Sequence, residues 1–469
     1  MRVKFLLLVQ VFISYSSSET TLRARFNQKT FLFSASFAKN VLQNKMKTLA
    51  LPSQTVSFGS GSVEIKKLKV ESFESPDIRI SLVAPNGLIF STSGGSVAIS
   101  GSWDAAYRIL WTMYISGDLS VKISGIKTLT RVNVLSQKGK LQLHFEECQL
   151  KIRNLNLKLY GGIGSWIANY FTSGAENDIK RSIEKDVCKN VRDNIEHLNK
   201  DLWSIKTQTN VVDNVYLNYH LLEDPKITKN FIQFDFSVYA TFGRRKCYLQ
   251  SEGKSINNNR QIISNHMIVL WFGEPMINCY LKTWYEAVNH HVYISDSTDT
   301  RRFRDLFNVN CTKTRNCTGR VSDLNKVDLD IQLMKAPLLR AENGIYIETS
   351  MKIVFYRSPK NLDSLKLTEL TIHTKSSLNV AITQRGITID TEKMMIKTNK
   401  VDNLDQMLLN DLTNVAKNVL KELKLWEHTI NVTEVIIPRL ALSSNASFIG
   451  IDNFIRTDMD FHLSNQRLS

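Results

Sequence analysis

The 469-residue sequence lacks the short motifs by which many hydrolases and nucleotide-binding enzymes are found. It has no Gly-x-Ser-x-Gly nucleophile elbow, no phosphate-binding loop and no His-Glu-x-x-His pair. Gly59–Ser62 is rich in glycine and serine, but its spacing is typical of a turn. His290 and His291 are followed by Asp296 and Asp299. Adjacent histidines in a strand point to opposite faces, so we expect surface histidines here. The sequence therefore predicts no catalytic residues, no metal ligands and no cofactor.

Proline and glycine are scarce, with 8 and 20 residues, which excludes collagen-like and low-complexity chains. Hydrophobic residues make up 43% and charged residues 22%, as in an ordinary globular protein. The 60 basic residues outnumber the 44 acidic ones, for a net charge of +16, yet no Lys or Arg tract accounts for the excess. A diffuse positive field favours anionic partners such as lipid head groups or glycans. On charge alone, nucleic acid fits equally well.

Long apolar runs are rare. Phe5–Tyr15 is apolar but too short to cross a bilayer as a helix. It follows the basic start Met1–Lys4 and precedes the small residues Ser16–Ser18, which predicts a secretory signal peptide over residues 1–18. A buried N-terminal helix is the alternative. No other stretch reaches the roughly 18 apolar residues of a membrane span, so we expect a secreted, extracellular protein.

In a secreted chain, the six cysteines are expected to form disulfides. Cys148 lies on a predicted strand and Cys188 on a predicted helix, so a bridge between them would fix the helix to the sheet. Closing that loop of about forty residues is worth about 3–4 kcal/mol in the chain-entropy model. The remaining four cysteines leave three pairings open, of which we favour Cys247–Cys279 with Cys311–Cys317. Four Asn-x-Ser/Thr sequons are predicted glycosylation sites: Asn310, Asn316, Asn431 and Asn445.

Apolar and polar residues alternate over much of the chain, which predicts antiparallel strands with one buried face. The apolar sets are Leu119, Val121, Ile123; Leu141, Leu143, Phe145; Leu155, Leu157, Leu159; Val327, Leu329, Ile331, Leu333; and Met351, Ile353, Phe355. The phase of the alternation slips between Phe145 and Cys148. This slip predicts a bulge or bend in a long curved strand.

Three stretches have helical spacing instead. Apolar residues recur every three or four positions from Ile179 to Leu202, which predicts a helix of about six turns. A second helix is predicted over Leu404–Leu423, with Asp402 or Asn403 as its N-cap. A third covers Phe33–Met46 and ends before Pro52. Thr298–Phe307 is a weaker candidate for a fourth.

The two halves of the chain repeat one order of elements. Asn86–Ser93 resembles Asn343–Ser350; each begins with an Asn-Gly turn signal and continues as a predicted strand. More strands and a long amphipathic helix follow in both halves, so we infer an internal duplication. The predicted domains are residues 19–242 and 263–469, joined by a polar linker over residues 243–262.

An ordered set of segments resembles the family of bactericidal/permeability-increasing and lipopolysaccharide-binding proteins. The set comprises Arg25–Lys29 with the helix that ends at Pro52, Pro85–Phe90 leading into Val97–Trp103, Gly164–Ile167 between Cys148 and Cys188, Leu404–Leu423, Val435–Pro438 and Phe448–Asp452. The resemblance spans nearly the whole mature chain and is strongest in residues 25–200.

This resemblance implies an α+β fold in the form of a boomerang. Two similar domains, each a highly curved antiparallel sheet or barrel with long amphipathic helices, are joined by a central sheet. It also implies the Cys148–Cys188 disulfide and one apolar phospholipid pocket per domain. The expected pocket residues are Phe33, Phe37, Val41, Trp166, Ile167 and Phe171 in the first domain, and Leu408, Leu412, Val415 and Val419 in the second. The structural alternative for each of these side chains is an ordinary core position.

Bactericidal members of the family carry a lysine-rich tip. The corresponding stretch here, Gly101–Trp111, has one Arg and one Asp and no net charge. Trp103, Tyr107 and Trp111 instead give it an aromatic character suited to a membrane or lipoprotein interface. Residues expected to bind anionic head groups are Lys45, Lys47, Lys66, Lys67, Lys69 and Arg108. That positive charge is partly cancelled by the carboxylates of Glu64, Glu71 and Glu74, so we expect weak lipopolysaccharide binding.

The sequence thus predicts a secreted, non-enzymatic lipid-binding protein whose partners are phospholipids, with lipopolysaccharide or other anionic lipids as further ligands and no nucleic acid. Bound phospholipid is expected. One alternative is an extracellular lipid-transfer protein without antimicrobial action. Another is a secreted lipase, disfavoured because no nucleophile–base pair has a recognisable spacing, although triads need not be local in sequence.

Overall fold

A computed structural model describes residues 20–46, 53–58, 61–108, 112–161, 165–212, 214–247, 264–288, 290–294, 327–357, 366–383, 386–398, 406–422, 440–443 and 446–463. The chain divides into two compact units. Unit 1 comprises residues up to Arg25, Lys206–Leu222 and Asp235–Ser469, and unit 2 comprises Phe26–Ile205 and Glu223–Phe234. The domain boundaries expected from the sequence stay a prediction.

Unit 2 is built on a six-stranded antiparallel sheet in the order β2-β3-β5-β6-β7, with β4 paired to β5 on the same side as β3. Its strands are β2 (Gln54–Phe58), β3 (Gly61–Glu74), β4 (Asp77–Val83), β5 (Gly87–Arg108), β6 (Thr112–Gln137) and β7 (Lys140–Tyr160). The short strand β10 (Lys226–Ile227) pairs with residues 232–233. The alternation predicted from the sequence is confirmed in β6 and β7, where one face is apolar.

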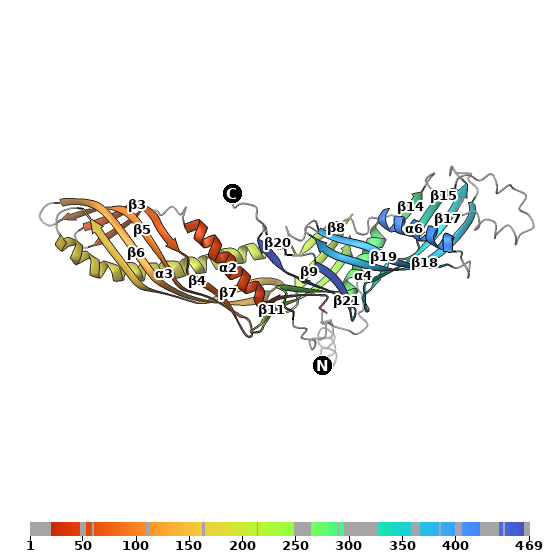
Figure 1. The fold of residues 1–469 in the computed structure, drawn as a ribbon, viewed down its shortest axis with the longest axis horizontal. Helices are drawn as coiled ribbons and strands as arrows, with labels where there is room; N and C mark the ends of the chain where they lie inside the picture. The colour runs from red at the N-terminus through yellow and green to blue at the C-terminus, as the bar shows by residue number, and fades with distance from the viewer. Residues whose placement is uncertain are drawn as a thin grey trace, which may run out of the picture. The chain divides into compact units, whose positions relative to one another are not determined.

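Bulges and glycines allow the long strands of unit 2 to curl strongly (Figure 1). The register of β5 and β6 skips Gly95 and Gly125, whose φ angles of +75° and +67° are ones that other residues rarely adopt. The register of β6 and β7 shifts at Glu146, which has no partner on β6. This shift is the bulge predicted between Phe145 and Cys148, and such bulges increase the local twist of a sheet.

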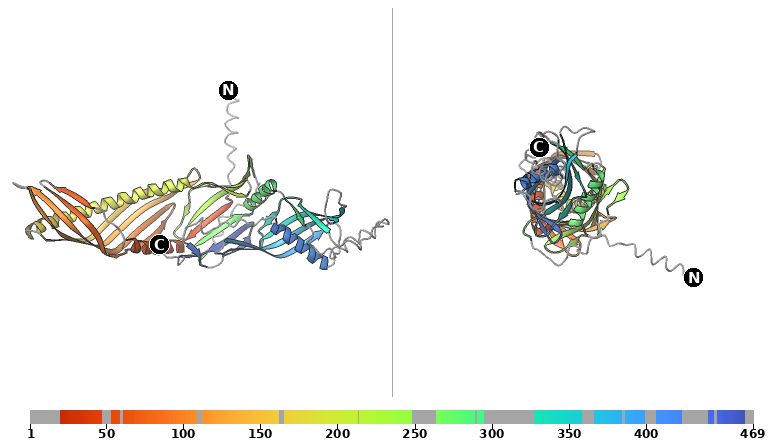
Figure 2. Two further views of the ribbon diagram at one scale, coloured as in Figure 1. Left: turned by 90° about the horizontal axis from the view of Figure 1, so that it is seen from above. Right: turned by 90° about the vertical axis from the view of Figure 1, so that its right-hand side faces the viewer.

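Two helices cover the edges of this sheet. Helix α2 (Gln28–Met46) packs against β4 and β3, and the 40-residue helix α3 (Ser165–Ser204) packs against β7. The two helices therefore lie at opposite sides of the curled sheet (Figure 2). Both were predicted, although α3 extends well beyond the predicted stripe. The Cys148–Cys188 disulfide, with Cα atoms 5.6 Å apart, joins β7 to α3 as expected.

Unit 1 holds most of a 15-stranded sheet, whose main path runs β14-β15-β17-β18-β21-β22-β13-β1-β11-β9-β8. The strands are β1 (Leu22–Asn27), β8 (Gln208–Val212), β9 (Val215–Leu221), β11 (Phe231–Phe242), β12 (Arg245–Lys246), β13 (Ile268–Gly273), β14 (His291–Ile294), β15 (Val327–Leu333), β16 (Leu338–Arg340), β17 (Tyr346–Arg357), β18 (Lys366–Thr383), β19 (Gly386–Thr398), β21 (Ala446–Ile451) and β22 (Phe454–Met459). A separate pair is formed by β20 (Leu440–Leu442) and β23 (Phe461–Leu463). The chain passes between the units four times: within β1, between α3 and β8, between β9 and β10, and within β11.

The core of unit 1 is closed by two helices, α4 (Glu274–Ala287) and α6 (Gln406–Glu422). Helix α6 was predicted; its proposed caps at Asp402 and Asn403 lie outside the described residues. Helix α4 was not predicted, although Pro275 in its first turn is a common start signal. A disulfide joins Cys279 of α4 to Cys247, as we favoured.

The α+β fold class predicted from the sequence is confirmed: antiparallel strands dominate and the helices are few. Within the described ranges, no helix has both the length and the apolar character that a membrane span needs. The Thr298–Phe307 stretch, the Cys311–Cys317 pairing, the linker from residue 248 on and the sequons at Asn310, Asn316, Asn431 and Asn445 lie outside the described residues.

Candidate functional site

The apolar face of helix α2 is the first part of the candidate lipid site in unit 2. Phe33, Phe37 and Val41 recur every four residues, and all three side chains are only partly buried. Gln43 fixes the end of the helix: its amide donates to the carbonyl of Phe73 (2.8 Å) and accepts from the backbone N–H of Ser75 (2.9 Å). The helix is thus held to the sheet by polar contacts, while its aromatic residues stay incompletely covered.

Helix α3 is fixed to the edge strand β7 by a series of side-chain bonds. The backbone N–H groups of Ile152 and Leu157 donate to the carboxylates of Glu184 (3.3 Å) and Glu176 (3.0 Å). An edge strand exposes such unpaired groups, and these helix side chains satisfy them.

The same arrangement recurs near the end of α3. The Asn199 amide accepts from the N–H of Leu143 at 2.8 Å and donates to its carbonyl at 2.7 Å. Lys140 donates to the carbonyl of Trp203 at 2.6 Å. Sequence reasoning missed Glu176, Glu184 and Asn199, because only their place beside an edge strand gives them this role.

The inner face of the sheet is apolar but incompletely buried. Val97, Ile123 and Ile152 are 8%, 6% and 8% exposed and pack against Ile179, Ile183 and Val187 of α3. By contrast, all of the largest side chains with under 2% exposure among the described residues lie in unit 1, for example Phe355 and Ile372. The interior of unit 2 is therefore less tightly filled than that of unit 1.

Several expected pocket residues cannot be placed in detail. The side chains of Trp166, Ile167 and Phe171 at the start of α3, and of Leu408 on α6, lie outside the described residues. On α6, Leu412, Val415 and Val419 are 0%, 5% and 1% exposed and pack within the main core of unit 1. The structure therefore brings Phe33, Phe37 and Val41 together on one helix, and the α6 set together in another unit.

Two of the lysines expected to bind head groups have carboxylate partners. Lys66 of β3 forms a close ion pair with Asp104 of β5, and this hydrogen bond raises the pKa of Lys66. Lys69 lies 3.6 Å from Glu71. A hydrogen bond of 2.6 Å from Ser100, and then Lys69, lowers the pKa of Glu71.

The other expected head-group residues differ in how far they are described. Lys45 and Lys67 are exposed, whereas Lys47 and the side chain of Arg108 lie outside the described residues. The expectation that Trp103 faces an interface is wrong. Its ring is 6% exposed, and Nε1 donates to the carbonyl of Asp118 at 3.2 Å, because Trp103 lies on the inner face of β5.

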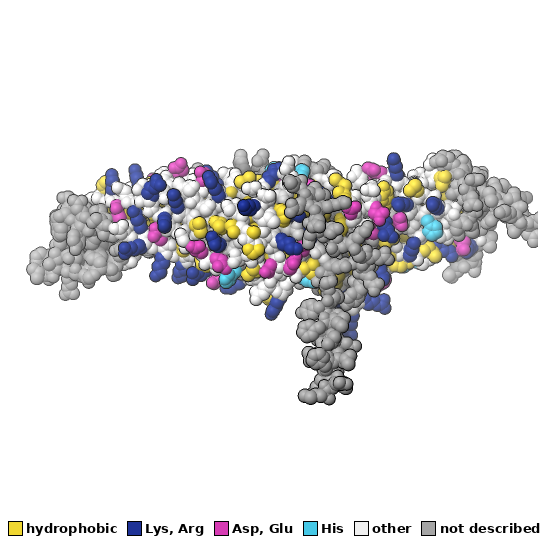
Figure 3. Space-filling model, turned by 90° about the horizontal axis from the view of Figure 1, so that it is seen from below, with side chains coloured by type: hydrophobic (Ala, Val, Ile, Leu, Met, Phe, Trp, Pro, Cys, Tyr) yellow, Lys and Arg dark blue, Asp and Glu magenta, His cyan; other side chains and the backbone are white. Residues whose placement is uncertain are grey.

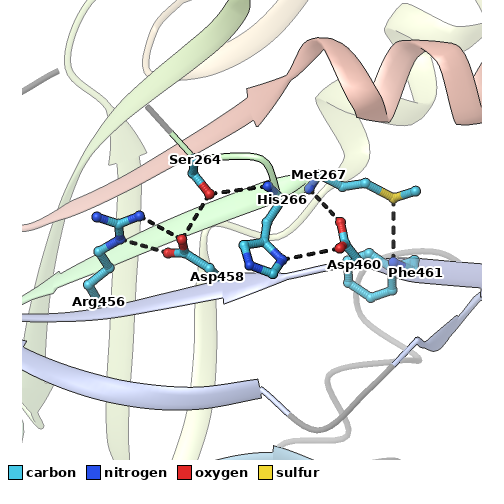
Figure 4. Close-up of polar contacts among 7 residues, drawn as sticks. All are labelled: Ser264, His266, Met267, Arg456, Asp458, Asp460 and Phe461. Carbon is cyan, nitrogen blue, oxygen red and sulfur yellow. Dashed lines mark hydrogen bonds and ion pairs between the residues drawn. The ribbon is translucent and has the colours of Figure 1, made fainter. Parts of the chain in front are cut away.

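In unit 1, Ser264 and His266 lie beside Asp458 and Asp460. The hydroxyl of Ser264 donates to Asp458 at 2.8 Å, and Arg456 holds the same carboxylate with two bonds. His266 Nδ1 lies 3.1 Å from Asp460 (Figure 4). The serine hydroxyl is thus bound to a carboxylate rather than to an imidazole, so the cluster does not form the nucleophile–base pair of a hydrolase.

A second Ser–His contact lies between neighbouring strands. Ser350 Oγ of β17 and His373 Nδ1 of β18 are 2.8 Å apart, but the serine is only 4% exposed. Among the described residues no carboxylate orients this imidazole, and no group of His, Cys, Asp and Glu is arranged to hold a metal. Neither contact has the geometry of a triad.

Comparisons with known proteins give a consistent result. The model of the LBP / BPI / CETP family, N-terminal domain, matches residues 31–198. The bactericidal permeability-increasing protein of Rattus norvegicus is 26% identical over 217 residues, 45% of this chain and 44% of the relative. The lipopolysaccharide-binding protein of Bos taurus is 25% identical over 202 residues, 42% of this chain and 41% of the relative. Each match thus spans less than half the length of the relative.

A solved structure extends the likeness beyond the matched sequence. The crystal structure of lipopolysaccharide binding protein aligns with a TM-score of 0.57 and covers 95% of this chain and 99% of its own. The sequence identity of that alignment is 14%, so it shows the fold.

Proposed function

Because this chain belongs to the LBP/BPI/CETP family, we propose that it is a secreted, non-enzymatic lipid-binding protein that holds phospholipid acyl chains within unit 2. The acyl chains lie against the inner face of the sheet, between α2 and α3. Phe33, Phe37 and Val41 contact them from α2, and Trp166, Ile167 and Phe171 from the start of α3. A second site in unit 1 is lined by Leu408, Leu412, Val415 and Val419.

One observation carries the proposal for unit 2. Large apolar side chains such as Phe33 and Phe37 keep part of their surface uncovered, whereas the largest side chains with under 2% exposure among the described residues, such as Phe355, lie in unit 1. Burying apolar area is worth about 25 cal/mol per Å². An incompletely covered apolar interior therefore favours a ligand that supplies the missing contacts, and an acyl chain has the matching chemistry.

The partners we propose are phospholipids first, with lipopolysaccharide as a weaker ligand. Two relatives carry names that refer to lipopolysaccharide binding or bacterial killing. In this chain, however, Asp104 and Glu71 compete for Lys66 and Lys69, which supports a phospholipid carrier over a lipopolysaccharide receptor. A transfer function without antimicrobial action fits the same contacts. Neither of the Ser–His contacts described above has the geometry of a hydrolase triad, which favours a non-enzymatic role.

The test is lipid mass spectrometry on the purified protein together with two variants of α2. We expect the wild type to carry phospholipid. Phe37→Ala should strongly lower the amount of bound phospholipid and should lower the free energy of unfolding only slightly, because the ring is incompletely packed against protein. Leu32→Ala on the same helix removes a side chain that is 66% exposed and should change neither quantity.

The opposite result would contradict the proposal. If Phe37 fills a solid core, its loss should cost about 3–5 kcal/mol of stability, and the wild type should carry no lipid. Hydrolysis of phospholipid or neutral esters by the purified protein would contradict the non-enzymatic part.

A further inference from the structure

The outer face of β6 and β7 carries five exposed cations: Lys122 and Lys127 on β6, and Lys151, Arg153 and Lys158 on β7. We propose that this surface, the β6–β7 cationic face, docks unit 2 onto an anionic lipid bilayer. The inference rests on the proposed lipid-binding function and deepens it, because it names the kind of surface from which lipid is collected.

Strand alternation places these cations on one face. Along β7, Leu150 and Ile152 are buried on the inner face, whereas Lys151 between them is exposed. Along β6, Ile123 is buried and its neighbour Lys122 is exposed. Because side chains alternate across a strand, the charged set shares the side of the sheet opposite to α3. Figure 3 shows Lys and Arg side chains gathered over the part of the surface that unit 2 forms.

The register brings like charges together. Lys127 lies directly opposite Lys151 in the β6–β7 ladder, and two such charges repel each other. Beside them, Gly125 faces Arg153, where a side chain at the glycine would come within 2.8 Å of the arginine Cβ. Glycine at this position, with φ of +67°, thus leaves room for a third cation beside the pair.

Within the described residues, none of these five cations has a carboxylate partner at ion-pair distance. The other half of the same outer face is different. There, Lys66 is paired with Asp104 and Lys69 lies beside Glu71. These five cations therefore form a group of uncompensated charges on β6 and β7. A localised cationic surface attracts an anionic one, and the attraction is reduced by salt.

Two exposed tyrosines favour a bilayer as the occupant. Tyr114 on β6 is 83% exposed and Tyr160 on β7 is 52% exposed. Both have the sequence parity of the outward residues Lys122 and Lys158, so they continue the cationic face toward one end of the sheet. Asp118 opposite Tyr160 is the exposed carboxylate at that end. Tyrosine is enriched at membrane interfaces, where its ring is apolar and its hydroxyl is wet.

The experiment is co-sedimentation with two kinds of vesicle, one of pure phosphatidylcholine and one in which a quarter is replaced by phosphatidylserine. Lys127→Ser with Lys151→Ser removes the opposed pair and should not destabilise the sheet, because it relieves a repulsion. Each cation near an anionic membrane contributes about fivefold to binding, so we expect about a 25-fold loss on phosphatidylserine vesicles. Binding to pure phosphatidylcholine should not change, and raising the salt should abolish the difference.

The control is Lys185→Ser with Lys189→Ser, which removes the same charge from exposed positions on α3. If this control loses much less than 25-fold in affinity for phosphatidylserine vesicles, the assignment is supported. If both variants lose affinity equally, only the net charge matters and the assignment is wrong. Binding of the wild type to heparin but not to phosphatidylserine vesicles would also overturn it, in favour of a polysaccharide. Lipid content by mass spectrometry is read separately, so a chain that docks without carrying lipid contradicts only the proposed function.

Discussion

Arg23 and Asp235 lie 212 residues apart in the sequence and form a buried ion pair in unit 1, with two hydrogen bonds of 2.6 and 3.0 Å. Their side chains are 5% and 4% exposed. Arg25 and Arg456 lie close by over the ring of Trp271, at 5.0 and 5.7 Å from its centroid. Burial, and then the neighbouring charges of Arg23 and Arg456, lower the pKa of Arg25. Asp235 thus offsets a crowded group of arginines.

Removing this carboxylate should destabilise unit 1 strongly. Asp235→Asn removes the carboxylate that faces the buried Arg23 side chain, and breaking a buried ion pair in this way typically costs about 3–5 kcal/mol. Asp77→Asn is the matched control, since it breaks the Lys39–Asp77 pair, whose side chains are 46% and 68% exposed, and should cost far less stability. Urea unfolding of the two variants measures both values. Equal losses would mean that burial does not decide the strength of the Arg23–Asp235 pair.

A second prediction concerns the stability of the protein at low pH. The pKa of Glu369 is about 2, below its ordinary value of 4.5. Hydrogen bonds from Lys366 at 2.5 Å and from Lys352 at 3.0 Å lower it. Because this pKa is lowered on folding, the ionised carboxylate stabilises the protein above pH 4.5, and the contribution disappears as the pH falls toward about 2. Glu369→Gln should therefore destabilise at neutral pH and lose its effect across that window. Urea unfolding at stepped pH tests this.

The control for the acid experiment is Glu369→Gln made in a chain that already carries Lys352→Gln and Lys366→Gln. With both lysines gone, the loss of Glu369 should leave the pH dependence nearly unchanged. A pH dependence that persists in this background would assign the effect to other carboxylates.

The α6 side chains allow a test of the second lipid site. Leu412 is fully buried, so Leu412→Ala should cost about 2–5 kcal/mol whether it lines a pocket or fills a core. Leu281→Ala on α4 belongs to the same cluster and is the matched control. If α6 lines a lipid site, only Leu412→Ala should lower the number of phospholipids per chain. If both variants lose stability and keep their lipid, the α6 residues are an ordinary core.

Local patterns accounted for much of the fold. The Ile179–Leu202 stripe predicted α3, and the phase slip after Phe145 predicted the bulge at Glu146. Both signals lie within a few neighbouring residues, where spacing alone decides which face is buried. Helix α4 was missed because its apolar residues follow a buried strand closely and its start signal, Pro275, was not used.

Contacts set by strand register could not be predicted. Lys66 and Asp104 are far apart in sequence, and they meet only because β3 and β5 pair with two register shifts. The same holds for Lys127 and Lys151, whose opposition depends on the bulge at Glu146. The aromatic character of the Gly101–Trp111 segment predicts an interface at Trp103, whereas the place of Trp103 on the inner face of β5 decides its burial.

The last prediction concerns lipopolysaccharide. In the wild type, Lys66 already forms an ion pair with Asp104, so Lys66→Ala should change lipopolysaccharide affinity little. Asp104→Asn should free the ammonium group for a phosphate. A charge-assisted hydrogen bond to a phosphate is then available to Lys66, so affinity at low salt should rise. The gain should shrink at physiological salt, because the group is exposed and its charge is screened.

Glu196→Gln on α3 makes the same change of charge at an exposed position that forms no ion pair within the described part of the chain. It separates a local effect from a general one. It should raise lipopolysaccharide affinity only slightly. The double variant Asp104→Asn with Lys66→Ala should return to the wild-type affinity, because the gain depends on that ammonium group. A tenfold loss from Lys66→Ala alone would contradict the prediction, since it would mean that lipopolysaccharide already displaces Asp104 from Lys66.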